Sequence, residues 1–292
     1  MPNIALMLTF LREVLVSRTL PREPEPALVM EETEQVAAYV EAGRINGVMA
    51  ASYLFHSAHV SQVLRGCKTV YDLGCGPATQ LAQIAELNPG IFFTGVDLSS
   101  TMLADAEKYI QKLGLTNVCF RQGDITTLDV LPDASADGVI STMALHHLPT
   151  FDHLRSCFCA IERVLKPDGT LYLTDFGRLK SLYSVIFFAY MNAKHQPHLF
   201  SLDYERSLRA AFLYEEFEEL TSRFFAPRAR VVSTFKVPFL LTVKTPSHAL
   251  PNELLARVRL MRKALPRKYR NDLDDMRIFF RLGGLSNDPF SG

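Results

Sequence analysis

One short motif, residues 69–77, restricts the fold of this chain more than any other stretch. It begins as an apolar run, Thr-Val-Tyr-Asp-Leu, and continues into a Gly-Cys-Gly-Pro turn that leads to a predicted helix over residues 78–87. Glycines between a strand and a helix let the backbone approach a bound ligand closely. Asp72 would repel the pyrophosphate of a dinucleotide, but it suits a ligand with an ammonium or sulfonium charge. Because Thr79 also stands where a dinucleotide motif needs its third glycine, the pattern favours such a cationic ligand.

Four more apolar runs follow this motif and alternate with segments of helical character. They cover residues 91–97, 118–125, 136–143 and 170–176. Strands that alternate with helices favour parallel pairing in one sheet. Residues 231–235 and 237–243 are predicted to close the sheet as an antiparallel hairpin at its edge, where Pro238 is tolerated. We therefore predict an α/β fold, a doubly wound Rossmann-like sheet of seven strands with an antiparallel edge strand.

The second apolar run ends in another acid, Asp97, which lies 21 residues after Gly76. In doubly wound nucleotide-binding folds, an acid at this place hydrogen-bonds ribose hydroxyls. The next residues, 98–103, open a helix with hydroxyl side chains suited to N-capping. We therefore expect Asp97 to bind both ribose hydroxyls of a nucleoside-containing ligand.

Together, these elements resemble the class I S-adenosylmethionine-dependent methyltransferases, whose first motif is commonly Asp/Glu-x-Gly-x-Gly, as in residues 72–76. The likeness covers about residues 68–177 and indicates a small-molecule enzyme similar to the ubiquinone/menaquinone and natural-product branches. It implies S-adenosylmethionine as the cofactor and S-adenosylhomocysteine as the product, with Asp124 pairing to the adenine amino group. The cofactor-binding residues expected on this basis are Asp72, Gly74, Gly76, Asp97, Leu98, Met102, Asp124, Ile125 and Ser141.

The rest of the chain is predicted to surround this core as one structural domain. We expect an N-terminal helical cap over residues 1–66, the cofactor-binding core over 67–180, a helical lid over 181–228, and a closing hairpin with C-terminal helices over 229–292. The first half of the lid is rich in aromatic rings. Ligands of open α/β sheets bind beyond the carboxyl ends of the strands, where this insertion begins. We interpret it as a substrate lid, with simple core packing of the rings as the alternative.

Methyl transfer from a sulfonium is an in-line displacement, so an enzyme must align the reactants and deprotonate an acidic nucleophile. His146 and His147 follow the fourth strand and His195 lies in the lid, so each is a candidate base near neutral pH, with a structural role as the alternative. No metal site is predicted, because His56 and His59 share a helix face without a third ligand nearby. The candidate substrate-contacting residues are Tyr39, His56, Asp175, Arg178 and Tyr190.

Composition limits the partners and the location of the protein. The 292 residues include 31 basic and 31 acidic ones, and this balance argues against a dominant nucleic-acid surface. Five cysteines fit reduced thiols in a cytoplasmic protein better than a disulfide framework.

The apolar residues 4–11 are too few to span a bilayer, so we predict an amphipathic helix, with peripheral membrane contact as the alternative. A monomer or homodimer acting on a small, partly apolar acceptor is expected.

The residues after the fourth strand exclude two subclasses of methyltransferase. Ser141-Thr142-Met143-Ala144 is neither the Asn/Asp-Pro-Pro-Tyr/Phe of enzymes that methylate nucleic-acid amino groups nor the Pro-Cys of cytosine C5 enzymes. The resemblance thus favours transfer to an O, N or C atom of a small molecule. Two alternatives stay open. One is a relative that binds S-adenosylmethionine as a regulator or cyclase; the other is an NAD(P)-dependent oxidoreductase, which Asp72 and Thr79 disfavour.

Overall fold

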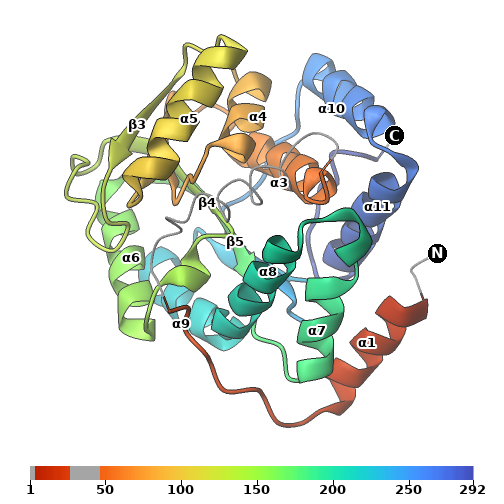
Figure 1. The fold of residues 1–292 in the computed structure, drawn as a ribbon. Helices are drawn as coiled ribbons and strands as arrows, with labels where there is room; N and C mark the ends of the chain where they lie inside the picture. The colour runs from red at the N-terminus through yellow and green to blue at the C-terminus, as the bar shows by residue number, and fades with distance from the viewer. Residues whose placement is uncertain (1–3, 27–46, 292) are drawn as a thin grey trace.

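The centre of the protein is one seven-stranded sheet (Figure 1). It is seen in a computed structural model, which describes residues 4–26 and 47–291. The strand order is β3-β2-β1-β4-β5-β7-β6; β1 to β5 pair in parallel, whereas β7 runs antiparallel to both β5 and β6. The strands are β1 Thr69–Leu73, β2 Phe92–Asp97, β3 Val118–Gln122, β4 Ala136–Thr142, β5 Leu165–Phe176, β6 Arg230–Ser233 and β7 Leu240–Lys244.

The place of β1 in the sheet decides where a ligand can bind. This strand pairs with β2 on one side and with β4 on the other, so the order of the strands reverses at β1. In open α/β sheets a crevice forms beyond the carboxyl ends of the strands at such a reversal. Asp72 pairs with Gly95 of β2 and with Ile140 of β4, and it therefore lies directly beneath that crevice.

Helices cover both faces of the sheet, as alternation of strands and helices predicts (Figure 1). Helices α3, α4 and α5 pack over fully buried side chains such as Val70 and Phe93. Helices α6 and α9 pack on the other face, over Leu73 and Val139. Their bounds are α3 Ala50–Val63, α4 Thr79–Leu87, α5 Ser100–Leu113, α6 Phe151–Val164 and α9 Tyr214–Phe225.

Local capping explains where two of these helices begin and end. The Ser99 hydroxyl accepts the N–H of Met102 at 3.2 Å, so α5 starts at Ser100, three residues after Asp97. The same helix ends at Gly114, whose φ of 67° is left-handed. Thr150 caps α6 in the same way by accepting the N–H of His153.

A third group of helices covers the crevice side of the sheet. An apolar cluster joins the N-terminal helix to the helices that follow β5 and to the C-terminal helix. Phe10 stacks on Phe279 with ring centroids 4.3 Å apart, and Phe188 stacks on Phe239 at 3.8 Å. The elements are α1 Ile4–Leu15, α7 Leu182–Tyr190, α8 His198–Ala210, α10 Asn252–Ala264 and α11 Arg267–Leu282, with short 3₁₀ turns η1 Leu145–His147 and η2 Ala193–His195.

Residues 16–26, here named the strap, run without helix or strand from α1 to the turn η1 (Figure 1). The Glu23 N–H donates to the Arg209 carbonyl of α8 at 3.1 Å. Arg209 in turn forms an ion pair with the Glu23 carboxylate. These contacts hold an extended segment against the body of the protein.

The predicted fold class is confirmed, including the antiparallel hairpin that ends the sheet. Three boundaries differ. β3 ends at Gln122 because the Asp124 carboxylate turns the chain by accepting the N–H and hydroxyl of Thr126. β5 starts at Leu165, which pairs with Ala136, so the strand begins five residues before the predicted run of 170–176. The hairpin strands themselves are shifted to 230–233 and 240–244.

The described residues also limit two other expectations. Of the predicted N-terminal cap, α1 and α3 are described, whereas residues 27–46 lie outside the described part. Within residues 4–26 and 47–291, no helix combines the length and apolarity needed to cross a bilayer.

The two motif glycines should differ in their tolerance of a side chain. Both have positive φ, but a Cβ on Gly74 would lie 2.4 Å from the Ala144 Cβ, whereas a Cβ on Gly76 would meet nothing within 4 Å. We expect Gly76→Ala to cost about 1 kcal/mol through its backbone alone. Gly74→Ala should cost clearly more, because the rigid turn before η1 must shift. Urea unfolding of both variants tests this, and equal losses would contradict it.

Candidate functional site

A cavity of about 750 Å³ lies beyond the carboxyl ends of β1, β2 and β4, under the third group of helices. One part of its wall is made by the loops that follow β1 and β2 and by residues 124–126. The other part is made by aromatic and apolar side chains of α1, α7, α8 and α11. The turn η1, with His146 and His147, lines the cavity as well. The cavity therefore combines a polar end at the strand termini with an apolar end under the helices.

The loop after β1 brings backbone atoms to the cavity surface. Gly74, Gly76 and Ala78 all have positive φ, between 52° and 68°. This alternation folds the loop tightly before α4, and the N–H groups of Gly74 and Cys75 both donate to the Val96 carbonyl. Gly76 lines the cavity and has open space where a side chain would be. A ligand can therefore lie directly against this backbone.

Asp97 at the end of β2 is held by the same loop. Its Oδ2 accepts the N–H of Gly76 at 2.8 Å and its Oδ1 accepts the N–H of Ser99 at 2.9 Å. Burial raises its pKa, while these backbone hydrogen bonds act in the opposite direction. Asp72 lies beneath, 4% exposed, and burial together with the charge of Asp97 raises its pKa to about 8. A cation bound above these two acids would favour their ionised forms and would then be attracted by both.

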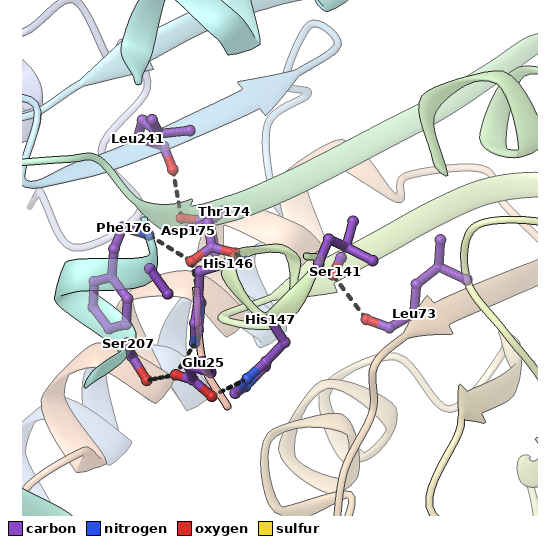
Figure 2. A network of polar contacts seen from close by, with 12 residues as sticks. Glu25, Leu73, Ser141, His146, His147, Thr174, Asp175, Phe176, Ser207 and Leu241 are labelled. Carbon is purple, nitrogen blue, oxygen red and sulfur yellow. Dashed lines mark hydrogen bonds and ion pairs between the residues drawn. The ribbon is translucent and has the colours of Figure 1, made fainter. Parts of the chain in front are cut away.

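Most of the residues expected to bind the cofactor line this one cavity. Seven do so: Gly74, Gly76, Asp97, Leu98, Met102, Asp124 and Ile125. The other two lie beneath the surface. Asp72 is buried under the loop, and the Ser141 hydroxyl donates to the Leu73 carbonyl at 2.8 Å, joining β4 to β1 (Figure 2). These nine residues come from four separate segments, and the sheet brings them together.

The turn η1 is fixed to the end of β5 by Asp175. This carboxylate accepts the N–H of Phe176 at 2.7 Å and the N–H of His146 at 2.9 Å. It also lies 2.6 Å from the His146 Nδ1. A carboxylate that already accepts two backbone donors serves as an acceptor here too, so Nδ1 carries the proton and Nε2 has the free lone pair. Nε2 faces Glu25, whose Oε1 is 4.0 Å away.

Glu25 of the strap lies between the two histidines (Figure 2). Its Oε2 is 2.6 Å from the His147 Nδ1, and its Oε1 accepts the Ser207 hydroxyl of α8 at 2.9 Å. Burial favours the neutral acid, but the hydrogen bond and charge of His147 outweigh it and lower the pKa of Glu25 to about 2. Burial likewise opposes the charged form of His147, yet Glu25 raises its pKa. The two residues form a partly buried carboxylate–imidazole pair.

Arg22 fastens the strap to the turn. Its Nη2 donates to the carbonyls of His146 and Leu148, its Nη1 to that of Pro149, and its Nε to that of Ala210. The guanidinium also lies 3.9 Å from the centre of the Phe212 ring. Burial and the neighbouring Arg178 lower its pKa to about 10, so it stays protonated near neutral pH. These contacts of Arg22 hold the strap in place, and with it Glu25, which follows three residues later and lies beside His147.

The apolar end of the cavity is lined by aromatic rings together with several polar side chains. Phe176 and Tyr204 lie with ring centroids 5.3 Å apart, and Phe188 stacks on Phe239. Asp203 of α8 is the acid beside Glu25 and His147; burial and Glu25 raise its pKa. Further polar side chains at this end are Asn192, Gln196, Lys268, Asn271, Asp272 and Asp275.

Several predicted site residues lie elsewhere. His195 is exposed on η2, and the Tyr190 hydroxyl donates to Glu205; neither is in the cavity wall. Arg178 binds the Ala211 carbonyl and Glu216 under the strap. His56 is buried in α3, with its Nδ1 2.8 Å from the Tyr172 hydroxyl, so it packs inside the core. Tyr39 lies outside the described residues.

The one group that could hold a metal ion within residues 4–26 and 47–291 is already joined by hydrogen bonds. Among the described residues, Glu25, His146 and His147 each offer one ligand atom within 4.8 Å of the others. In the structure the Glu25 oxygens are taken by His147 and Ser207. We therefore describe this group as an ion-pair network.

Sequence analysis did not find Arg22, Glu25 or Asp203. Residues 21–26 alternate prolines with charged residues, and this pattern indicates only a stiff linker. Its contacts span more than 120 residues of sequence, from Glu25 to His147 for example. The sequence feature that could have pointed to Arg22 and Glu25 is their charge. Two acids and an arginine stand between prolines, shortly after an apolar helix.

Comparison with known proteins agrees with this geometry. Residues 65–207 match the family model described as "Methyltransferase domain". The chain is 33% identical over 129 residues to the ubiquinone biosynthesis O-methyltransferase of Methylococcus capsulatus, which covers 44% of this chain and 51% of that protein. The chain thus spans about half the length of the curated relatives it matches first.

Solved structures share the fold at low identity. A SAM-dependent methyltransferase from Aquifex aeolicus is 18% identical with a TM-score of 0.51, over 74% of this chain and 98% of that one. The plantazolicin methyltransferase, solved with a substrate analog and SAH, is 14% identical with a TM-score of 0.53, over 80% of this chain and 85% of that one. Both show the fold alone.

The ion pair at the strap has a measurable signature. Glu25→Gln removes the charge that raises the pKa of His147, so burial should then lower that pKa. In the parent, the Glu25 contribution to stability is lost as the pH falls from about 4.5 to about 2, and the His147 contribution is lost as the pH rises above about 6.5. The stability difference between parent and variant should be widest between these limits.

Titration of the histidine side chains by NMR measures the pKa, and urea unfolding across the pH range measures the stability. Glu23→Gln, an exposed neighbour on the same strap, is the matched control and should leave His147 unchanged. An unaltered His147 titration in Glu25→Gln would rule out the pair.

Proposed function

Because residues 65–207 form a domain of the class I S-adenosylmethionine-dependent methyltransferase family, we propose that this protein transfers a methyl group from S-adenosylmethionine to an O, N or C atom of a small, partly apolar acceptor. One observation carries the proposal. A single cavity joins the Asp97 loop to the aromatic end, and His146, oriented by a carboxylate, lies on its wall. Cofactor, acceptor and base can therefore meet in one enclosed space.

The polar end of the cavity suits the proposed cofactor. Each Asp97 oxygen accepts one backbone N–H and retains a lone pair for a ribose hydroxyl. The exposed Asp124 carboxylate is an acceptor for the adenine amino group, and Leu98 and Met102 offer apolar contact to the ring. The open space at Gly76 admits the ligand against the backbone. The hydrogen-bonding groups at this end of the cavity thus match a nucleoside whose positively charged substituent lies above Asp72.

When bound, S-adenosylmethionine supplies a methyl group on a sulfonium that an aligned nucleophile displaces in line. The chain contributes alignment and proton removal. His146 Nε2 takes the proton from an acceptor hydroxyl or amine, while Asp175 keeps the ring in the required tautomer and orientation. Glu25, 4.0 Å from that nitrogen, stabilises the imidazolium that results.

The aromatic end supports a small acceptor. Phe176, Tyr204 and Phe239 present ring faces, which suit an apolar or planar molecule. The surrounding helices enclose the space, so a polymer would need a different entrance. We also propose a cytoplasmic location and leave the choice between monomer and homodimer to measurement.

The first experiment separates the proposal from its alternatives. Calorimetry with S-adenosylhomocysteine and with NADPH distinguishes a methyltransferase site from an oxidoreductase site. Production of S-adenosylhomocysteine with a panel of small phenols, carboxylic acids and amines then distinguishes an enzyme from a regulator. Addition of EDTA should leave both results unchanged. Binding without product on any acceptor would favour the regulator.

Asp97 should govern cofactor affinity. Asp97→Asn removes the charge that strengthens the ribose hydrogen bonds, each worth about 1.5–3 kcal/mol, so the Kd should rise about tenfold or more. Calorimetric titration with S-adenosylhomocysteine measures the change. Asp105→Asn on the exposed side of α5 makes the same charge change outside the cavity and is the control. Unchanged affinity in Asp97→Asn would remove Asp97 from the binding site.

His146 should govern the chemical step without affecting cofactor binding. His146→Ala is expected to lower kcat by about 10²–10⁴-fold on an acceptor that must lose a proton, with S-adenosylhomocysteine affinity retained. His195→Ala is the comparison, because that ring is exposed on η2 away from the cavity wall. Full activity in His146→Ala would exclude His146 as the base and would leave alignment of the two reactants as the source of catalysis.

A further inference from the structure

Helix α1 has apolar side chains on its outer face as well as on its inner one. Ile4, Leu8, Leu11 and Leu15 follow the spacing of one helical stripe and are 75%, 61%, 54% and 74% exposed. Their opposite face contains the buried Leu6. A helix that is apolar on both faces gains nothing from exposing the outer one to water, so that face indicates an apolar partner.

The neighbouring helix α7 continues this surface. Tyr183 and Ile186 are exposed there, and Arg12 of α1 lies 4.5 Å from the centre of the Tyr183 ring. The start of α7 is joined to α1 through Glu13, whose two oxygens accept the N–H groups of Lys180 and Ser181. We name the surface formed by Ile4, Leu8, Leu11, Leu15, Tyr183 and Ile186 the outer patch.

The charges beside the outer patch are positive. Within residues 4–20, Arg12 and Arg18 are the exposed charged residues, because Glu13 is 3% exposed and occupied by α7. Lys180, partly buried, lies at the junction of the two helices. An apolar stripe with basic residues at its side matches a surface that is apolar inside and anionic outside.

The inner faces of the same two helices line the cavity. Leu6 and Phe10 of α1 and Phe187 and Phe188 of α7 are part of its wall. Met191, directly after α7, both lines the cavity and is 43% exposed. The cavity therefore reaches the surface close to the outer patch.

From these observations we propose that the outer patch docks on an anionic lipid bilayer, with α1 lying in the interfacial plane. Twelve residues of helix are about 18 Å long, which suits a position within the interface and excludes a transmembrane one. The apolar stripe enters the boundary between headgroups and acyl chains, while Arg12 and Arg18 meet the headgroup phosphates. The proposal concerns this surface and does not depend on methyl transfer.

Vesicle flotation tests the proposal on the full chain. The parent should float with vesicles of phosphatidylcholine and phosphatidylglycerol. Leu8→Glu and Leu11→Glu should each lower its partition about tenfold, since each removes one apolar side chain from the bilayer. Leu260→Glu on α10 is the matched control: this leucine is 65% exposed and far from the patch in sequence, and the variant should float like the parent.

A second pair of variants, Arg12→Gln and Arg18→Gln, tests the contribution of positive charge to vesicle binding. Each should weaken binding to the anionic vesicles about fivefold and leave binding to pure phosphatidylcholine unchanged. Thermal melting and calorimetry with S-adenosylhomocysteine on every variant show that the fold and the cofactor site are intact, which separates this result from a failure of the proposed function.

Three outcomes would overturn the proposal. The parent could stay at the bottom of the gradient with every vesicle. Leu8→Glu could float as well as Leu260→Glu. Sedimentation could reveal a dimer that Leu8→Glu dissociates and Leu260→Glu does not, in which case a second copy of the chain covers the outer patch.

Discussion

The hydrogen bonds of Asp175 determine the geometry of the whole site. This one buried carboxylate joins the end of β5 to the turn η1 through two backbone N–H groups and the His146 ring. The position of η1 then sets how closely Ala144 approaches Gly74 and which carbonyls Arg22 can reach. A buried carboxylate is stable only when its oxygens are satisfied, so the turn and the carboxylate hold each other in place.

Several charged side chains of the protein lie together at one place, and neighbouring charges and dipoles compensate each of them. Glu25, His147 and Asp175 lie close together beside the Phe176 ring (Figure 2). Arg22 joins them through the carbonyls of His146 and Leu148, with its guanidinium over the Phe212 ring. Each charge has a partner of opposite sign or several dipoles, and the low dielectric strengthens these contacts. The opposing pKa directions of Glu25 and His147 follow from this pairing.

Sequence reasoning recovered what depends on local pattern. Alternating apolar runs and the Gly-x-Gly turn predicted a seven-stranded sheet with an antiparallel edge strand. Strand-terminal acids such as Asp97 predicted one end of the cavity, because the end of a strand fixes the position and direction of its last side chain. His146 and Asp175 were also identified, since both follow strands. His195 and Tyr190 were placed in the site from their position in the insertion, but helices η2 and α7 turn them away from the cavity wall. Glu25 and Arg22 were missed because an extended strap has no periodicity from which its contacts can be inferred.

The strap has a consequence for the order in which the protein is assembled. Glu25 meets a histidine 122 residues later in the chain, whereas the strands of the sheet need mainly shorter connections. Closing so long a loop costs entropy that only a nearly complete sheet can offset. The scaffold can therefore be folded before its charged centre exists. Proteolysis or thermal unfolding of this molecule would therefore report on the sheet, whereas the charged centre forms in a separate, later step when the strap docks on η1.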